Sequence, residues 1–491
     1  RLDYPDLDVI RVEDTYYMVS TTMHFMPGCE ILQSFDLVHW EHVTYVYETL
    51  DHTDAQQLKS GQNIYGQGMW AASLRYHEGR FCICFVANDT RKTYLYTSEK
   101  IDGPWKKQLI EGFYHDGSLL FDEDGRNYIV YGNDEIWITE LNEDLTAPKK
   151  DGLHRLLVSD HKNPELGYEG SHIQKINGYY YIFLIHSLRD RWMRTEACFY
   201  SDSLEGEFTG GDVLCDDRGY CGQGVAQGGI VDTPDGKWYA MLFQDSGAVG
   251  RIPILLPVTW KDHFPFFGQN GHVPEEIEVH STRPGYIYQP LVGSDDFCNG
   301  LLPRWQFNHD PDPRYYHLDA LQGTYTITTR EVCTELTQAV NTLTQRMSYP
   351  SCAAEVTVDA SALKEGDVAG LCALQSCYAA VGITKHHGKY EVLMLDKKED
   401  GILDMTEGTV VESHQMDFRL EADFCNMKDE ARCYYRVNKG DWLPIGTVHK
   451  LYFKLDHFTG CRFGLFCYAA EETGGSACFR DFKYYDVDEI S

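Results

Sequence analysis

The chain has 491 residues, more than a single hydrophobic core usually supports, so we expect two domains. It carries 43 basic and 75 acidic residues, which gives a formal net charge of −32. Nucleic acid and anionic membrane surfaces would repel such a chain, so neither is expected as a partner. Aromatic residues make up 13% of the sequence, a content that suits β-structure and sites for flat, neutral ligands.

Sixteen cysteines are scattered along the chain without a CxxC pair. This spacing favours buried free thiols in a reducing compartment over a disulfide framework. No apolar run reaches the ~18 residues of a membrane span, and no signal peptide is visible. We therefore expect a cytoplasmic protein, with the reservation that the chain opens at Arg1 and a removed leader would leave no trace. The sequence leaves the oligomeric state open, a homo-oligomer included.

One pattern recurs five times in the first 280 residues: a turn residue, one or two variable positions, then aromatic and aliphatic residues. The copies begin at Asp14, Gly79, Gly125, Gly178 and Gly236, with spacings of 65, 46, 53 and 58 residues. Periods near 50 with one hairpin signature per unit are typical of propeller blades. The pattern predicts a five-bladed β-propeller over residues 1–285, and its alternative is an ordinary run of hairpins in a sandwich.

After Trp260 the repeat stops, and residues 281–294, with two prolines and two glycines, indicate a connection. Short alternating strands without the blade signature follow, at 354–359, 390–395, 462–468 and 478–482. They predict a second domain over residues 295–491, a jelly-roll-like β-sandwich. The expected fold class is therefore all-β.

Three carboxylates precede blade hairpins by nearly the same distance. Asp6 lies 8 residues before its hairpin, and Asp116 and Glu169 each lie 9 residues before theirs. Such offsets place the three side chains at equivalent depths around the axis, where glycosidic hydrolysis would need two carboxyl groups. For any one of them alone, a surface or turn carboxylate is the plainer interpretation. Strand alternation also puts Asp8 on the face of Asp6, so Asp8 is an alternative to it.

Four motifs carry a resemblance to a known family. They are Pro5-Asp6 before residues 9–12, His115-Asp116 before residues 117–119, Tyr168-Glu169 before residues 170–173, and Gly250-Arg251. Together they resemble glycoside hydrolase family 43, the β-xylosidases and α-L-arabinofuranosidases, and the resemblance covers nearly the whole chain. Leu7 and Asp8 depart from the family, which usually has Pro and Ser there.

The resemblance implies an inverting mechanism. Asp6 would be the general base, Glu169 the general acid, Asp116 the residue that orients the acid and raises its pKa, and Arg251 a contact of the terminal sugar. An acid must be protonated near neutral pH, so we expect burial beside Asp116 to raise the pKa of Glu169 above ~4.3. Trp70, Met23 and Phe25 would wall the pocket, although packing between blades explains them equally well.

Gln227 stands where many family members have a histidine near the axis, which in some members helps hold a hydrated calcium ion. We expect no required cofactor and assign no metal ligand. Gln227 can still offer an oxygen, so a structural calcium ion stays open as an alternative that the sequence does not support. Gln227 itself is expected to contact substrate.

The favoured substrate is a neutral oligosaccharide, and the favoured activity is release of xylose from β-1,4-xylo-oligosaccharides by a β-D-xylosidase. An α-L-arabinofuranosidase remains the alternative, because the two sugars present similar hydroxyl groups. A retaining fructosidase would want an Asn-Asp-Pro nucleophile near the start and a Glu-Cys acid, and neither is found. A sugar-binding propeller without catalysis is disfavoured by the three carboxylates.

Overall fold

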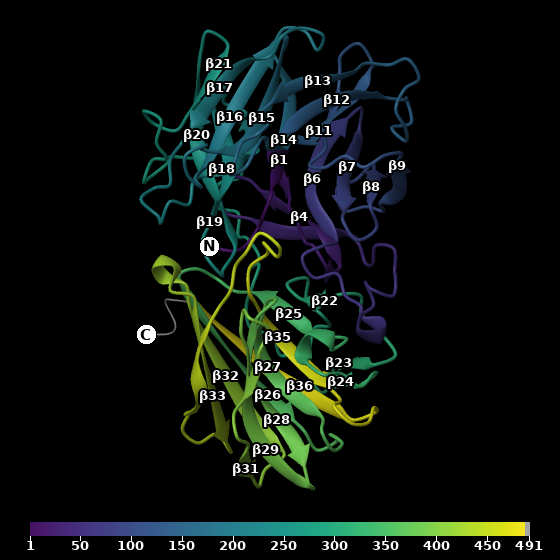
Figure 1. The fold of residues 1–491 in the computed structure, drawn as a ribbon, viewed down its shortest axis with the longest axis vertical. Helices are drawn as coiled ribbons and strands as arrows, with labels where there is room; N and C mark the ends of the chain where they lie inside the picture. Colours follow the sequence, from purple (N-terminus) through teal and green to yellow (C-terminus); the bar gives the residue numbers. More distant parts are fainter. Residues whose placement is uncertain (487–491) are drawn as a thin grey trace.

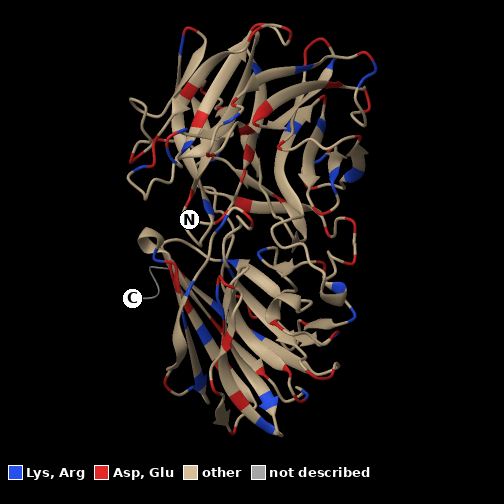
Figure 2. Cartoon of the chain, viewed as in Figure 1, with Lys and Arg blue, Asp and Glu red and all other residues tan. Residues whose placement is uncertain are grey.

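The computed structural model describes residues 1–486, which fold into two all-β domains stacked along the long axis of the molecule (Figure 1). Aspartate and glutamate are spread over both domains, consistent with the acidic composition (Figure 2). Among the described residues, no helix is long and apolar enough to cross a membrane.

Residues 8–267 form five antiparallel sheets of four strands. The first contains β1 (Asp8–Val12), β2 (Thr15–Val19), β4 (Gly28–Ser34) and β5 (Glu41–Tyr47). The second contains β6 (Met69–His77), β7 (Arg80–Ala87), β8 (Lys92–Ser98) and β9 (Lys106–Ile110). The third contains β10 (Ser118–Phe121), β11 (Asn127–Asn133), β12 (Glu135–Leu141) and β13 (His154–Ser159). The fourth contains β14 (Glu169–Ile176), β15 (Tyr179–Ser187), β16 (Arg194–Ser201) and β17 (Thr209–Leu214). The fifth contains β18 (Ala226–Asp232), β19 (Trp238–Asp245), β20 (Arg251–Lys261) and β21 (Phe264–Phe267). The five-bladed propeller is confirmed.

The repeated turn residues join the first and second strands of each blade. Glu78 and Gly79 have φ of 47° and 78°, and Asn177 and Gly178 have φ of 50° and 84°. Two successive residues with positive φ are the mark of the type I′ turn, whose twist matches that of the flanking strands. The sequence pattern therefore marks one end of the innermost strand in each blade, and the opposite ends of these strands gather at one mouth.

The innermost strands β1, β6, β10, β14 and β18 contact one another in a ring. Apolar side chains fill the space between neighbouring blades, as Leu74 and Phe85 do between the first two. Each blade is built from one stretch of chain, so no strand from one terminus completes a blade at the other. Packing of Val9 against Tyr239 and Met241 closes the ring.

The second domain is a sandwich of two antiparallel sheets, as predicted. One sheet runs in the order β23 (Tyr316–Asp319), β24 (Thr324–Thr328), β36 (Ser476–Asp486), β26 (Ser351–Asp359), β32 (Gln415–Asp423), β33 (Glu430–Val437) and β34 (Leu443–Lys450). The other runs β3 (Phe25–Met26), β22 (Gln306–Asn308), β25 (Leu343–Arg346), β35 (Arg462–Tyr468), β27 (Val368–Leu374), β28 (Tyr378–His386), β29 (Lys389–Lys397) and β30 (Leu403–Met405), with β31 (Thr409–Val411) also paired to β29. Short 3-10 helices are η1 (Lys59–Gly61), η2 (Leu336–Gln338) and η3 (Cys425–Met427).

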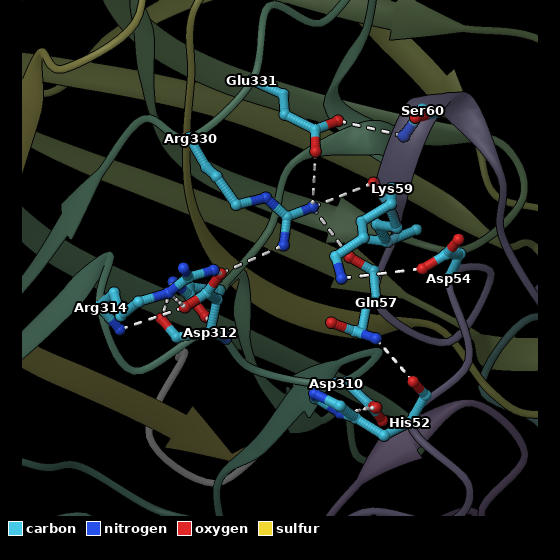
Figure 3. Close-up of polar contacts among 12 residues, drawn as sticks. His52, Asp54, Gln57, Lys59, Ser60, Asp310, Asp312, Arg314, Arg330 and Glu331 are labelled. Atoms are coloured by element: carbon cyan, nitrogen blue, oxygen red, sulfur yellow. Dashed lines mark hydrogen bonds and ion pairs between the residues drawn. The ribbon is translucent and has the colours of Figure 1, made fainter.

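The two domains share a strand and a set of polar contacts. β3 leaves the first blade and pairs with β22 of the sandwich. Figure 3 shows the segment after β5 against the sandwich, where His52 lies 2.7 Å from Asp310. Nearby, Arg330 donates to the carbonyl of Gln57 at 2.8 Å. The junction is therefore a packed interface rather than a loose linker.

Three histidines are buried without charge at this junction: His24, whose pKa burial holds well below its ordinary value, and its neighbours His309 and His457. His309 Nε2 accepts the backbone N–H of Ile64 at 2.9 Å, and His457 Nδ1 lies 2.8 Å from Ser376 Oγ. Burial lowers the pKa of His309 to about 3, helped by His457, and burial beside Arg462 lowers the pKa of His457 to about 3. Neither His309 nor His457 takes up a proton in the folded protein at mildly acidic pH.

We expect the free energy of unfolding to fall as the pH drops from about 6.5 towards 3. In this window the unfolded chain protonates His309 and His457 while the folded chain protonates neither, so their contribution is complete above pH ~6.5 and is lost below it. Each histidine adds at most about 1.4 kcal/mol per pH unit. Denaturant unfolding at several pH values measures the slope. His309→Gln should flatten it, whereas the same change at the exposed His161 should not. An equal slope in all three proteins would contradict this account.

Candidate active site

A cavity of about 260 Å³ lies at the end of the propeller axis opposite the hairpins. All five blades contribute to it through residues at or just before the start of the innermost strand, and the sandwich adds two residues. Its lining comprises Asp6, Trp70, His115, Asp116, Asn133, Leu166, Glu169, Trp192, Arg194, Gln227, Arg251, Leu455 and Phe458. The three carboxylates with the shared sequence offset are thus brought together in one cavity.

Asp6 is a buried carboxylate, 4% exposed, held from two sides. Thr21 Oγ1 donates to its Oδ2 at 2.7 Å, and Arg251 Nη1 donates to its Oδ1. Asp6 itself has a φ of 50°, so it lies in a left-handed turn before β1 begins. The charge of Asp6 is neutralised by one guanidinium while its position is fixed by a hydroxyl.

Asp8, the alternative to Asp6, lies outside the cavity lining. β1 starts at Asp8 and Asp6 precedes it with positive φ, so strand alternation does not extend to Asp6. Asp8 Oδ2 accepts Arg75 Nη1 at 2.7 Å, and its Oδ1 lies 3.1 Å from His172 Nδ1. Burial alone would raise the pKa of Asp8, but Arg75 and His172 outweigh it and lower the pKa to about 2. Asp8 is therefore an ionised anchor within the propeller.

His115 lies between the other two carboxylates. Its Nε2 is 3.4 Å from Asp116 Oδ2 and 3.5 Å from Glu169 Oε2. Asp116 also accepts the backbone N–H of Gly170 at 2.9 Å, and Glu169 Oε2 accepts Asn133 Nδ2 at 2.8 Å. Sequence reasoning missed a role for His115 although the residue is adjacent to Asp116, because the role depends on its distance from Glu169.

The pKa values of His115, Asp116 and Glu169 differ from what the sequence predicted for the acid. Burial raises the pKa of Asp116 to about 6. Burial alone would lower the pKa of His115, but Asp116 and Glu169 raise it to about 9. Burial would raise the pKa of Glu169, yet the His115 imidazolium holds it below its ordinary value. The expected upward shift of Glu169 is therefore wrong for the free protein, because the expectation did not include this cation.

His115→Gln and Asp116→Asn should shift the pH profile of kcat/KM in opposite directions. Losing the imidazolium raises the pKa of Glu169, and losing the carboxylate of Asp116 lowers it. An acid works only while protonated, so the alkaline limb should move up in His115→Gln and down in Asp116→Asn, each by about one pH unit. The profile of an aryl glycoside measures both. An unmoved limb with a uniform loss of rate would mean that the residue positions substrate without tuning the acid.

The other residues expected to bind substrate fall into two groups. Trp70 and Gln227 line the cavity, but Met23 and Phe25 do not. Phe25 belongs to β3, and the guanidinium of Arg462 lies 3.5 Å from the centre of its ring. Met23 is completely buried, and its Sδ accepts the hydroxyl of a sandwich residue. Both therefore pack between the two domains and do not wall the cavity.

The sandwich completes the cavity with a loop that the sequence did not point to. The Phe458 ring centre lies 5.3 Å from that of Trp70 and 4.2 Å from the Arg251 guanidinium. The loop is tied to the propeller by Asp3, which accepts the backbone N–H of Gly460 and that of Arg251, both at 2.7 Å. One wall of the cavity therefore comes from the second domain.

The calcium site that the family resemblance raises does not fit the residues at the axis. Arg75 donates to Ser118 Oγ at 2.8 Å and to the carbonyl of Leu119 at 2.9 Å, besides its bond to Asp8. A guanidinium among these oxygens already supplies the positive charge that a calcium ion would bring. Within residues 1–486, His115, Asp116 and Glu169 are the single group with three potential ligand atoms, all within 4.8 Å of one another.

Both domains of the chain match known protein families. The family model described as glycosyl hydrolases family 43 matches residues 1–265, and the model described as the β-xylosidase C-terminal concanavalin A-like domain matches residues 294–485. A β-xylosidase from Formosa agariphila is 26% identical, over 99% of this chain and 88% of the relative. A non-reducing end α-L-arabinofuranosidase from Bacteroides ovatus is 23% identical, over 82% and 78%.

Among solved structures, a bifunctional GH43-CE protein from Bacteroides eggerthii superposes with a TM-score of 0.91 and 42% identity. The match covers 99% of this chain but 63% of the other, so this chain spans less than two thirds of that protein's length. The two family models together match both domains of the chain. The chain belongs to glycosyl hydrolases family 43 and is a glycoside hydrolase.

Proposed function

We propose that the protein is an inverting, exo-acting β-D-xylosidase that releases xylose from β-1,4-xylo-oligosaccharides. The observation that carries the proposal is the pair of carboxylates facing one cavity from different blades in different surroundings. Asp6 is paired with a guanidinium, whereas Glu169 lies beside the imidazole of His115, which also neighbours Asp116. Two carboxyl groups made unequal by their surroundings are what acid–base hydrolysis of a glycoside requires.

The roles follow from these surroundings. Asp6 accepts a proton from the water that attacks the anomeric carbon on one face of the sugar, and Glu169 protonates the leaving oxygen. In the free protein the proton resides on His115, 3.5 Å from Glu169 Oε2. A sugar that fills the cavity displaces water, which raises the pKa of Glu169 and favours the protonated acid. Arg251 holds the base and can donate to a sugar hydroxyl.

The shape of the cavity supports exo action. A volume of about 260 Å³ is small, and Leu455 and Phe458 from the sandwich form part of its wall. Aromatic rings such as Trp70 and Phe458 suit the apolar face of a sugar. A cavity closed on one side by a second domain accepts the end of a chain rather than its middle.

Proton NMR during hydrolysis tests the proposal. An inverting β-xylosidase releases α-xylose first from xylobiose, before mutarotation. The same protein should cleave 4-nitrophenyl β-D-xyloside faster than 4-nitrophenyl α-L-arabinofuranoside. Initial release of β-xylose would overturn inversion, and a preference for the arabinofuranoside or for arabino-oligosaccharides would reverse the substrate assignment.

The proposal assigns no step to a metal, since Asp6 and Glu169 supply both proton transfers. Activity on xylobiose is therefore expected to survive dialysis against EDTA and to be unchanged by added calcium. A loss that calcium restores would show that the guanidinium of Arg75 does not replace the ion.

A further inference from the structure

One charged residue of the cavity wall has no role in the scheme above. Arg194 begins β16, lines the cavity and is 4% exposed. Its Nη1 donates to Asp245 Oδ2, and within residues 1–486 this is the single hydrogen bond of its side chain. Its Nε is buried without a partner. A buried guanidinium N–H left unpaired is costly, so an arginine kept in this state beside a cavity indicates a ligand that completes it.

Arg194 is fixed relative to the general base by a chain of ion pairs. Asp245 Oδ1 accepts Arg251 Nε at 3.1 Å while its Oδ2 accepts Arg194, and Arg251 in turn holds Asp6. In the sheet register, Asp245 is the partner of Arg251 at the adjoining ends of β19 and β20. The two arginines therefore form a rigid pair, and any sugar placed against Asp6 lies near Arg194.

The backbone and the neighbouring rings fix Arg194 further. Gly224 passes so close that a Cβ there would lie 1.8 Å from the Arg194 carbonyl oxygen. The rings of Trp192 and Phe243 each have their centres 5.4 Å from its guanidinium carbon. A donor held this firmly has lost its conformational freedom before the ligand arrives, which favours selective binding.

The charge of the cavity decides what the ligand atom is. Asp6, Asp116 and Glu169 face His115, Arg194 and Arg251 in the lining, so the charges of the cavity balance and suit a neutral sugar, whose hydroxyl oxygen is the acceptor within reach. We propose that Arg194 is a specificity-determining residue that donates a hydrogen bond to a ring hydroxyl of the non-reducing-end sugar. This inference rests on the proposed function, because it assumes that a pentose occupies the cavity with its anomeric carbon at Asp6.

Deletion of the hydroxyl and deletion of the guanidinium should have the same, non-additive effect. In the wild type, one member of a panel of 2-, 3- and 4-deoxy 4-nitrophenyl β-D-xylosides should lose about 10- to 100-fold in kcat/KM, the usual range for a hydrogen bond to a charged group. Arg194→Met should lose a similar factor on the parent glycoside and then no longer distinguish the parent from that deoxy substrate. Arg194→Lys should retain part of the discrimination, because it keeps the charge but not the planar group.

The control is Arg191→Met, the same replacement three residues earlier, before β16, at a side chain that is 58% exposed and outside the lining. It should keep the wild-type pattern. Should Arg194→Met fail to fold, as judged by its thermal unfolding, Arg194→Lys carries the measurement, together with the affinities of xylose and the matching deoxyxylose.

The outcomes separate this inference from the proposed function. Should every deoxy substrate lose the same factor in the wild type and in the Arg194 variant, Arg194 is a structural residue and the inference is overturned, while the xylosidase assignment stands. A wild-type protein that cleaves the arabinofuranoside but not the xyloside overturns the substrate assignment, and the deoxy panel is then made on that sugar. Inactivity on both parent glycosides overturns both proposals.

Discussion

Asp6→Asn is expected to lower kcat/KM on xylobiose and on 4-nitrophenyl β-D-xyloside alike, by roughly 10²–10⁴-fold. A base activates the attacking water whatever the leaving group, so a good leaving group gives no relief. The isosteric amide still accepts the hydroxyl of Thr21, which favours an intact fold. Steady-state kinetics on the two substrates, with thermal unfolding of each protein, measure the effect.

Asp8→Asn is the matched control, since it is the same replacement two residues away. Asp8 lies outside the cavity and holds Arg75 and His172. Its loss leaves a buried guanidinium without its carboxylate, which should cost about 3–5 kcal/mol of stability while the folded protein keeps most of its activity. The opposite result, with Asp8→Asn inactive and Asp6→Asn mild, would exchange the two assignments.

Glu169→Gln should nearly abolish cleavage of xylobiose and spare much of the rate on a dinitrophenyl xyloside. A poor leaving group needs a proton as the bond breaks, whereas a dinitrophenolate departs without one. The ratio of the two rates, rather than either rate alone, identifies the acid. Equal losses on both substrates would show that Glu169 is not the acid, and the role of His115 beside it would have to be assigned again.

Much of the fold could be predicted because its signals are local. A pair such as Asn177-Gly178 determines a tight turn by its own backbone preferences, and five hairpins at similar spacing define the blades. The same regularity revealed Asp116 and Glu169, whose common offset from the hairpin places them at one end of the axis. The position of a carboxylate within the repeat thus predicted its place in the active site, which its residue type alone could not.

The parts of the site that escaped prediction depend on contacts across the chain. Phe458 enters the cavity from the other domain, and nothing in its neighbourhood marks it as a wall residue. Phe25 was predicted to line the cavity and does not. It belongs to β3, which joins the sandwich, whereas the strands before and after β3 in the sequence form the first blade. The pKa of Glu169 depends on a histidine in a different blade, so no local pattern contains it.

Because Phe458 lies near the end of the chain, the wall of the active site is completed late in synthesis. The last blade ends at Phe267, about 190 residues before Phe458, which corresponds to roughly 10–40 s of synthesis at ~5–20 residues per second. During that time a nascent propeller holds every catalytic carboxylate but lacks both the aromatic wall and the Asp3–Gly460 tie. A chain truncated between the domains would therefore be a propeller whose carboxylates are open to water on the side that Phe458 covers in the full chain.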